Sequence, residues 1–134
     1  MFLQPKQTKY KKMRKSTLKK FEYKSNKLTF GEIGLKATSS GNVSARQIEA
    51  ARRAIIRKLK RKGKMWLRIF PTTPVTRKAS ESRMGKGKGN VSFWVSPVFS
   101  GQVLFEICGI PSALAFEALR AGGYKLPVST KIIK

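Results

Sequence analysis

The sequence predicts one α+β domain in two layers, with two main helices on a mixed sheet, plus a basic N-terminal arm. Strand-like and helix-like runs follow the order strand, helix, several strands, helix, strand, with mostly short connections. The chain has 134 residues, and its 40% hydrophobic content is enough for a single core. We therefore divide it into an arm over residues 1–28 and a domain over residues 29–134.

The arm is the first element. Residues 1–28 hold ten Lys and Arg against one Glu. Four aromatic residues are spread among them: Phe2, Tyr10, Phe21 and Tyr23. Cations interleaved with aromatic side chains are typical of a segment laid on nucleic acid, where they meet phosphates and bases. We expect the arm to be ordered only on such a partner, and the alternative is a solvated tail.

A strand and a long helix come next. Residues 28–37 (LTFGEIGLKA) predict a strand, the following TSSGN predicts a turn, and residues 44–63 predict one helix. Ser44 and Gln47 have the spacing of a capping box at its start. Gly63 can end it in the left-handed conformation.

This helix has two chemically distinct faces. At about 100° per residue, one side collects Ile48, Ala51, Ile55 and Leu59. The nearly opposite side collects Arg46, Arg53, Arg57 and Lys60. We expect the apolar side to pack on the sheet and the basic side to meet phosphates. A basic amphipathic helix can instead lie on an anionic membrane or be merely solvated.

Several strand-like runs follow the helix. KMWLRIFP (residues 64–71) alternates along its length and stops at prolines. PVTRKASES (74–82) then leads into a glycine-rich segment. NVSFWVSPVFSG (90–101) and QVLFEICG (102–109) predict a hairpin that turns at Ser100 and Gly101.

The chain closes with a helix and a short strand. Residues 112–123, after Pro111, predict a helix with Leu114, Ala118 and Ala121 along one side. The double glycine at its end is typical of a helix stop. KLPVSTKII (125–133) predicts the last strand.

Residue types argue against catalysis. The chain has no His and no Asp, and its six acids are scattered singly: Glu22, Glu32, Glu49, Glu81, Glu106 and Glu117. Histidine-based triads, His/Cys zinc sites and carboxylate-rich magnesium sites all lack their parts. The one cysteine, Cys108, is expected as a small buried residue. We predict that the protein is not an enzyme and uses no cofactor, metal or small-molecule substrate.

The charge points to a polyanionic partner. Thirty Lys and Arg against six acids give a formal net charge of +24. Repulsion on this scale opposes a compact isolated state, so nucleic acid or an anionic membrane is the expected setting. We expect neither a membrane-spanning helix nor a secretory signal, because the chain lacks a long apolar run and its start lacks an apolar core.

The segment SRMGKGKGN (82–90) combines flexibility with positive charge. It matches neither nucleotide-loop pattern, since G-x-x-x-x-G-K-[ST] is absent and GKGKG is not G-x-G-x-x-G. Glycines permit close backbone approach and positive φ, while lysines contact phosphates and Arg83 offers a planar fork. We predict an RNA-contacting loop, and the alternative is a flexible hairpin tip.

Two motifs carry a family resemblance, ARQIEAARRA (45–54) and RMGKGKGNV (83–91). Together with LQPKQTKYKKM, FGEIGLKA, WLRIFPTTPVT, SGQVLFE and KLPVSTK, in this order, they resemble the universal large-subunit ribosomal protein sixteen over nearly the whole chain. The sequence departs from that family at Ile107 and Cys108, in KSTLKKFEYKSN and at RAGGY. Both basic motifs are intact.

The resemblance implies a hammerhead-like α/β fold embedded in large-subunit rRNA, on the aminoacyl side of the peptidyl transferase centre. It also implies that the protein joins the particle late in assembly. By the same resemblance the glycine-rich loop points toward the acceptor stem of transfer RNA. The enrichment in Lys and Ile and the form of SGQVLFE favour an organellar ribosome, mitochondrial rather than plastid, with a bacterial one as the alternative.

From these patterns we predict rRNA contacts at Lys6, Lys9, Lys11, Lys12, Arg14, Lys15, Arg46, Arg53, Arg57, Lys60, Lys64 and Arg68. We predict a loop in the transfer RNA path made by Arg83, Met84, Gly85, Lys86, Gly87, Lys88 and Gly89. Neighbouring ribosomal proteins are expected partners, and a membrane or a second copy of the chain is not. The rival functions are an architectural DNA-binding or condensing protein and, third, a membrane-active basic protein.

Overall fold

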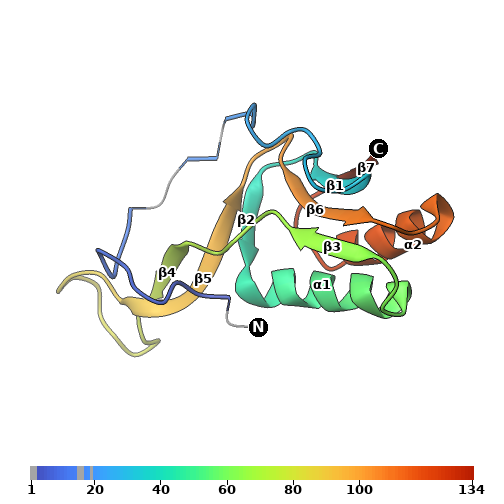
Figure 1. The fold of residues 1–134 in the computed structure, drawn as a ribbon. Coiled ribbons are helices and arrows are strands. Elements are labelled where there is room, and N and C mark those ends of the chain that lie inside the picture. The colour runs from blue at the N-terminus through green and yellow to red at the C-terminus, as the bar shows by residue number, and fades with distance from the viewer. Residues whose placement is uncertain (1–2, 15–16, 19) are drawn as a thin grey trace.

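The structure is a computed structural model that describes residues 3–14, 17–18 and 20–134 (Figure 1). Its elements, in chain order, are β1 (Ile33–Ala37), β2 (Gly41–Ser44), α1 (Ala45–Leu59), β3 (Lys64–Leu67), β4 (Thr73–Arg77), β5 (Asn90–Val98), β6 (Val103–Cys108), α2 (Ser112–Gly123) and β7 (Thr130–Ile133). The expected order of strand, helix, several strands, helix and strand is confirmed, and so is the α+β class. Among the described residues, no helix is long and apolar enough to cross a membrane.

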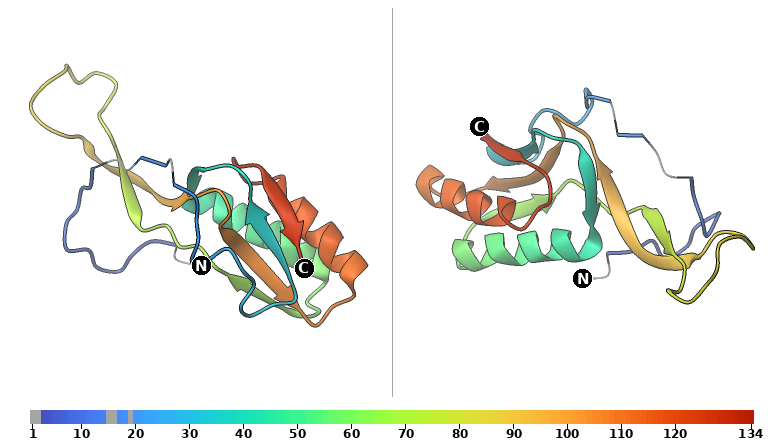
Figure 2. Two further views of the ribbon diagram at one scale, coloured as in Figure 1. Left: turned by 90° about the horizontal axis from the view of Figure 1, so that it is seen from above. Right: turned by 180° about the vertical axis from the view of Figure 1, so that it is seen from behind.

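The strands form two antiparallel sheets. Four strands pair in the order β3-β6-β1-β7, and three pair in the order β2-β5-β4. Figure 2 shows α1 and α2 side by side on one face of the four-stranded sheet. The core lies between the four-stranded sheet and the two helices. Inward residues of the strands, such as Leu35, Phe105 and Ile107, pack there with the buried faces of both helices. The three-stranded sheet extends away from this core toward the glycine-rich loop (Figure 1).

The two predicted strand runs at 90–109 are both strands, but the hairpin between them is wrong. β5 pairs with β2 and β4, whereas β6 pairs with β1 and β3. The chain leaves one sheet at Val98 and enters the other at Val103, and Gly101 takes a φ of +92° in between. Alternation within each run indicates a strand, but it does not select the partner strand.

Two local predictions also need correction, and one strand was not predicted. Residues 28–32 are not part of β1, because the backbone N–H groups of residues 29–31 donate to the carboxylate of Glu106 instead of to a ladder. The segment GN of the predicted turn belongs to β2, and residues 73–77 form β4, which no pattern in the sequence predicts. Both of the latter strands are short and pair with β5.

Helix α1 begins as predicted and ends earlier. The Ser44 side chain accepts from the Gln47 backbone N–H, and the Gln47 side chain accepts from the Ser44 backbone N–H, which completes the capping box. The last helical residue is Leu59, and Lys60 takes the left-handed conformation with a φ of 49°. Gly63, also at positive φ, shapes the turn into β3 rather than the helix end.

Helix α2 ends at the double glycine, at Gly123, as predicted. The end is not a left-handed turn, because neither glycine has a positive φ. A Cβ on Gly122 would come within 2.6 Å of the Ile55 side chain, so this glycine allows α1 and α2 to approach closely. The buried side of α2 is Ala115, Ala118, Leu119 and Gly122, while Leu114 and Ala121 are only half-buried.

The end of the arm is hydrogen-bonded to the four-stranded sheet. Lys36 Nζ donates to the Asn26 carbonyl, and Val103 N–H donates to the Ser25 carbonyl. At its other end the arm buries Leu3, which is 8% exposed, in the core. The arm thus contacts the domain at both ends, and that RNA alone orders it stays a prediction.

Cys108 is half-buried rather than fully buried. Its thiol donates to Glu32 Oε1 at 3.2 Å, and this hydrogen bond, with burial, raises the pKa of the thiol. The proton is held on sulfur, so the side chain acts as a neutral donor.

Candidate nucleic-acid interface

Helix α1 separates its two faces as the sequence predicts. Ile48, Ala51, Ile55 and Leu59 are buried against the sheet and α2, whereas Arg46, Arg53, Arg57 and Lys60 are exposed. The capping box and the apolar periodicity fix the rotation of the helix, so the basic side must face outward. This side is a row of cations along one helix.

Glu49 organises two arginines of this helix. It accepts from Arg52 at 2.7 Å and from Arg53 at 2.9 Å. The Arg52 hydrogen bond, then that of Arg53, outweighs burial and lowers the pKa of Glu49 to about 2. The carboxylate stays charged and holds both guanidinium groups in place. Arg57, by contrast, makes no ion pair with any described residue, so its charge is available to a phosphate.

Arg68 does not belong with the surface cations. Its guanidinium donates to the carboxylate of Glu106, which is fully buried, and its side chain is only 17% exposed. The same guanidinium lies 5.1 Å from the centre of the Phe30 ring. Because it neutralises a buried charge, we withdraw Arg68 from the predicted rRNA contacts.

Lys64 and its neighbours form a stacked column. The Lys64 ammonium lies 5.1 Å from the Trp66 ring centre, and Trp66 stacks on Phe30 with centroids 6.2 Å apart. Lys64 is exposed and keeps donors free, so it remains compatible with a phosphate contact.

The predicted cations of the arm are exposed where the structure describes them: Lys6, Lys9, Lys11, Lys12 and Arg14. Lys15 and the aromatic residue Phe2 lie outside the described residues. Lys12 is also bonded within the protein, since its ammonium donates to the Lys88 carbonyl at 2.8 Å. The ammonium of Lys88 in turn donates to the Met13 carbonyl. The arm and the glycine-rich loop are therefore latched to each other.

The glycine-rich loop connects β4 to β5 and projects from the body (Figure 1). Gly85 and Gly87 have φ of 95° and 90°, with nothing near the place of a Cβ, so backbone conformation rather than space requires glycine. Gly89 differs, because a Cβ there would meet the Arg77 backbone at 2.5 Å. Arg83, Met84, Lys86 and Lys88 are all exposed.

Sequence reasoning missed Lys78 at the base of this loop. Its ammonium donates to the Gly85 carbonyl at 2.6 Å and closes the loop on itself. Arg77 and Lys78 shortly precede the glycine segment, and a search for basic residues just before it would have found them.

Within residues 3–14, 17–18 and 20–134, no three His, Cys, Asp or Glu side chains gather to hold a metal ion. The arrangement of exposed cations on a helix, an arm and a loop is suited to binding a polyanion along an extended surface.

Comparison with known proteins gives the chain its relatives. The family model described as ribosomal protein L16p/L10e matches residues 5–133. The large ribosomal subunit protein uL16 of Francisella tularensis subsp. holarctica (strain FTNF002-00 / FTA) is 52% identical over 132 residues, which cover 98% of this chain and 96% of the relative. The protein of the same name from Aeromonas hydrophila subsp. hydrophila is 52% identical over 131 residues, with the same coverage.

Proposed function

Because the chain belongs to the ribosomal protein L16p/L10e family, we propose that it binds large-subunit rRNA through its helix and arm and helps to position aminoacyl transfer RNA through its loop. The protein is a structural constituent of the large ribosomal subunit, so rRNA and other ribosomal proteins are its partners. The architectural DNA-binding alternative has no support among the relatives. A structural role, rather than catalysis, is what this family implies.

The observation that carries the proposal is the division of α1. Its four core residues are buried, and its exposed side carries Arg46, Arg53 and Arg57. A helix fixed in this way holds its cations at set positions. Fixed cations suit the phosphates of a folded RNA, whose positions are also fixed, better than they suit a flexible polyanion.

The assignment of the loop to transfer RNA rests on its shape and charge. Met84, Lys86 and Arg83 are exposed on a segment that extends beyond the three-stranded sheet. Two glycines at positive φ let the backbone turn sharply without a side chain in the way. Such a loop can enter a gap between RNA strands while its cations meet phosphates.

The relatives named above are bacterial, which fits a bacterial ribosome rather than the organellar one that composition favoured. We therefore propose the bacterial large subunit as the setting. The organellar hypothesis rested on the Lys and Ile enrichment and on the form of SGQVLFE.

The test separates assembly from transfer RNA binding. Large subunits carrying Arg83→Ala should contain normal amounts of this protein. Their free energy of binding aminoacyl transfer RNA should weaken by about 1.5–3 kcal/mol, because the planar guanidinium donates directional hydrogen bonds that alanine cannot replace. Lys86→Ala is the comparison variant: it removes a point charge from the same loop, so it should mainly reduce the salt slope of binding. Occupancy is measured at two salt concentrations. Unchanged occupancy with Arg83→Ala at both would show that the loop does not contact transfer RNA.

A further inference from the structure

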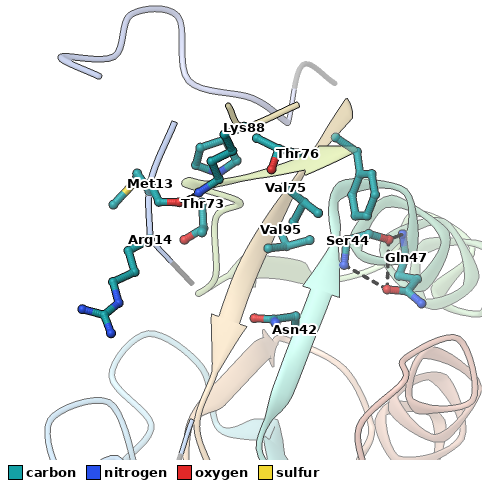
Figure 3. Close-up of a pocket in the computed structure, with 12 residues that line it drawn as sticks. Met13, Arg14, Asn42, Ser44, Gln47, Thr73, Val75, Thr76, Lys88 and Val95 are labelled. Atoms are coloured by element: carbon teal, nitrogen blue, oxygen red, sulfur yellow. Dashed lines mark hydrogen bonds between the residues drawn. The ribbon is translucent and has the colours of Figure 1, made fainter. Parts of the chain in front are cut away.

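A groove lies on one face of the three-stranded sheet (Figure 3), and Arg46, Arg53 and Arg57 of α1 are not among the residues that line it. The register places Ser44, Val95 and Thr73 directly opposite one another across the three strands. Val75 and Phe93 form the next row. These rows make a floor that is mostly apolar and includes an aromatic ring. Phe93 is 45% exposed, so its ring is accessible, whereas Val95 is only 4% exposed.

Two walls rise from this floor. The start of α1 contributes Gln47 on one side, and the arm contributes Met13 and Arg14 on the other, with Lys88 of the loop beside them (Figure 3). The groove has a volume of about 620 Å³, within the range of roughly 300–1,000 Å³ that is usual for sites of small organic groups. No carboxylate lines it among the described residues.

The polar groups of the groove are of the kind that read a base edge. Gln47 Oε1 is occupied by the capping box, which leaves its amide Nε2 as a donor that makes none of the hydrogen bonds found among the described residues. Asn42 adds an exposed amide with a donor and an acceptor, and Thr73 adds a hydroxyl. Unstacked bases of RNA are bound in this way, by stacking on an aromatic ring and by hydrogen bonds along their edges.

The rim of the groove is positive. Arg14 and Lys88 both line it, and the Lys12 ammonium is held next to Lys88 through the Lys88 carbonyl. This charge complements a phosphate. The same charge is a poor match for a polypeptide, which offers at most scattered carboxylates. The backbone N–H and C=O groups of a polypeptide would also find no hydrogen-bond partners on the face of a sheet.

We propose that this groove binds one unstacked nucleotide of the rRNA, with its base on Phe93 and its phosphate at Arg14. This inference rests on the proposed function, because the RNA is that of the large subunit. In this proposal the arm does more than supply positive charge, because the hydrogen bonds between Lys12, Met13 and Lys88 close one wall of the site.

A photo-crosslink in assembled subunits tests the proposal. Benzoylphenylalanine replaces Phe93, and in a control it replaces Tyr124, an exposed aromatic residue at the end of α2. We expect the probe at position 93 to form an adduct with one rRNA nucleotide, seen as a single reverse-transcription stop that the control lacks. An adduct with a ribosomal protein, or none with RNA, would overturn the proposal.

The second measurement follows that nucleotide by base-specific chemical probing. Phe93→Glu should raise its reactivity roughly five- to hundredfold, the range expected when a single base–aromatic stack is lost, and Tyr124→Glu should leave it unchanged. Equal reactivity in wild-type and Phe93→Glu subunits would refute base binding in the groove. If Phe93→Glu fails to enter subunits, the crosslink decides alone, because that probe keeps an aromatic ring. Absence of the wild-type protein from large subunits would instead refute the proposed function.

Discussion

Replacing Glu106 by Gln tests the buried carboxylate that joins residues 29–31 and Arg68 to the four-stranded sheet. Glu106 Oε2 accepts from the backbone N–H groups of Thr29, Phe30 and Gly31, at 3.2, 2.7 and 2.8 Å, and its other oxygen accepts from Arg68. An amide cannot serve both sides, because its NH₂ must face either three N–H donors or a guanidinium. We expect the free energy of unfolding to fall by about 3–5 kcal/mol, the usual loss when one partner of a buried pair is removed.

The effect should depend on pH. Burial raises the pKa of Glu106, but the backbone donors and then Arg68 outweigh it and hold the pKa below its usual value of 4.5. A lowered pKa in the folded state means that the stabilisation is present above the unfolded pKa and is lost as the pH falls through the folded one. The difference between wild type and Glu106→Gln should be constant above about pH 5 and shrink below it.

Denaturant unfolding followed by tryptophan fluorescence measures this loss, since Trp66 lies directly opposite Glu106 in the sheet. Glu117→Gln is the control. Glu117 pairs with Lys58 at the surface, so its replacement should leave stability unchanged within error. A Glu106→Gln loss below about 1 kcal/mol at neutral pH would refute the reasoning, because it would mean that the three backbone donors and Arg68 find other partners.

Three further predictions follow from the packing. Gly122→Ala should destabilise the protein by about 1–3 kcal/mol in thermal unfolding, because the new methyl meets Ile55, although the same change at an open helix site would stabilise. Lys88→Ala should speed chymotryptic cleavage of the arm in the free protein, because it removes the hydrogen bond to the Met13 carbonyl. Lys86→Ala should not, since the Lys86 side chain makes no hydrogen bond with any described residue. Ile55→Ala should cost about 2–5 kcal/mol through a cavity, whereas Arg57→Ala should keep the fold and reduce the salt slope of RNA binding by up to about 1.

Local signals in the sequence predicted the helices well. The capping box at Ser44 and Gln47 and the period of Ile48, Ala51, Ile55 and Leu59 fix the start and rotation of α1, and the structure confirms both. The bounds of α2 are also as predicted. These features depend on neighbours within a few residues, which is why one chain read alone reveals them.

The errors concern partners that lie far away in the chain. β5 and β6 follow each other but pair in different sheets, and no pattern within either run states this. In the sequence Glu106 is one of the scattered acids, yet its carboxylate accepts hydrogen bonds from Arg68, 38 residues away, and from three backbone N–H groups 75–77 residues away. The packing role of Gly122 was not predicted, because the side chain that requires a glycine there, Ile55, lies on another helix. The groove on the three-stranded sheet was missed likewise, since three strands, α1 and the arm build it together.

A density map of the purified large ribosomal subunit that contains this chain tests the central claim most directly. The account predicts that Arg46, Arg53 and Arg57 of α1 lie within about 4 Å of rRNA phosphate oxygens, while Ile48, Ile55 and Leu59 remain against the sheet. A map in which that arginine side faces solvent, or native particles whose nucleic acid is DNA without large-subunit rRNA, would contradict it.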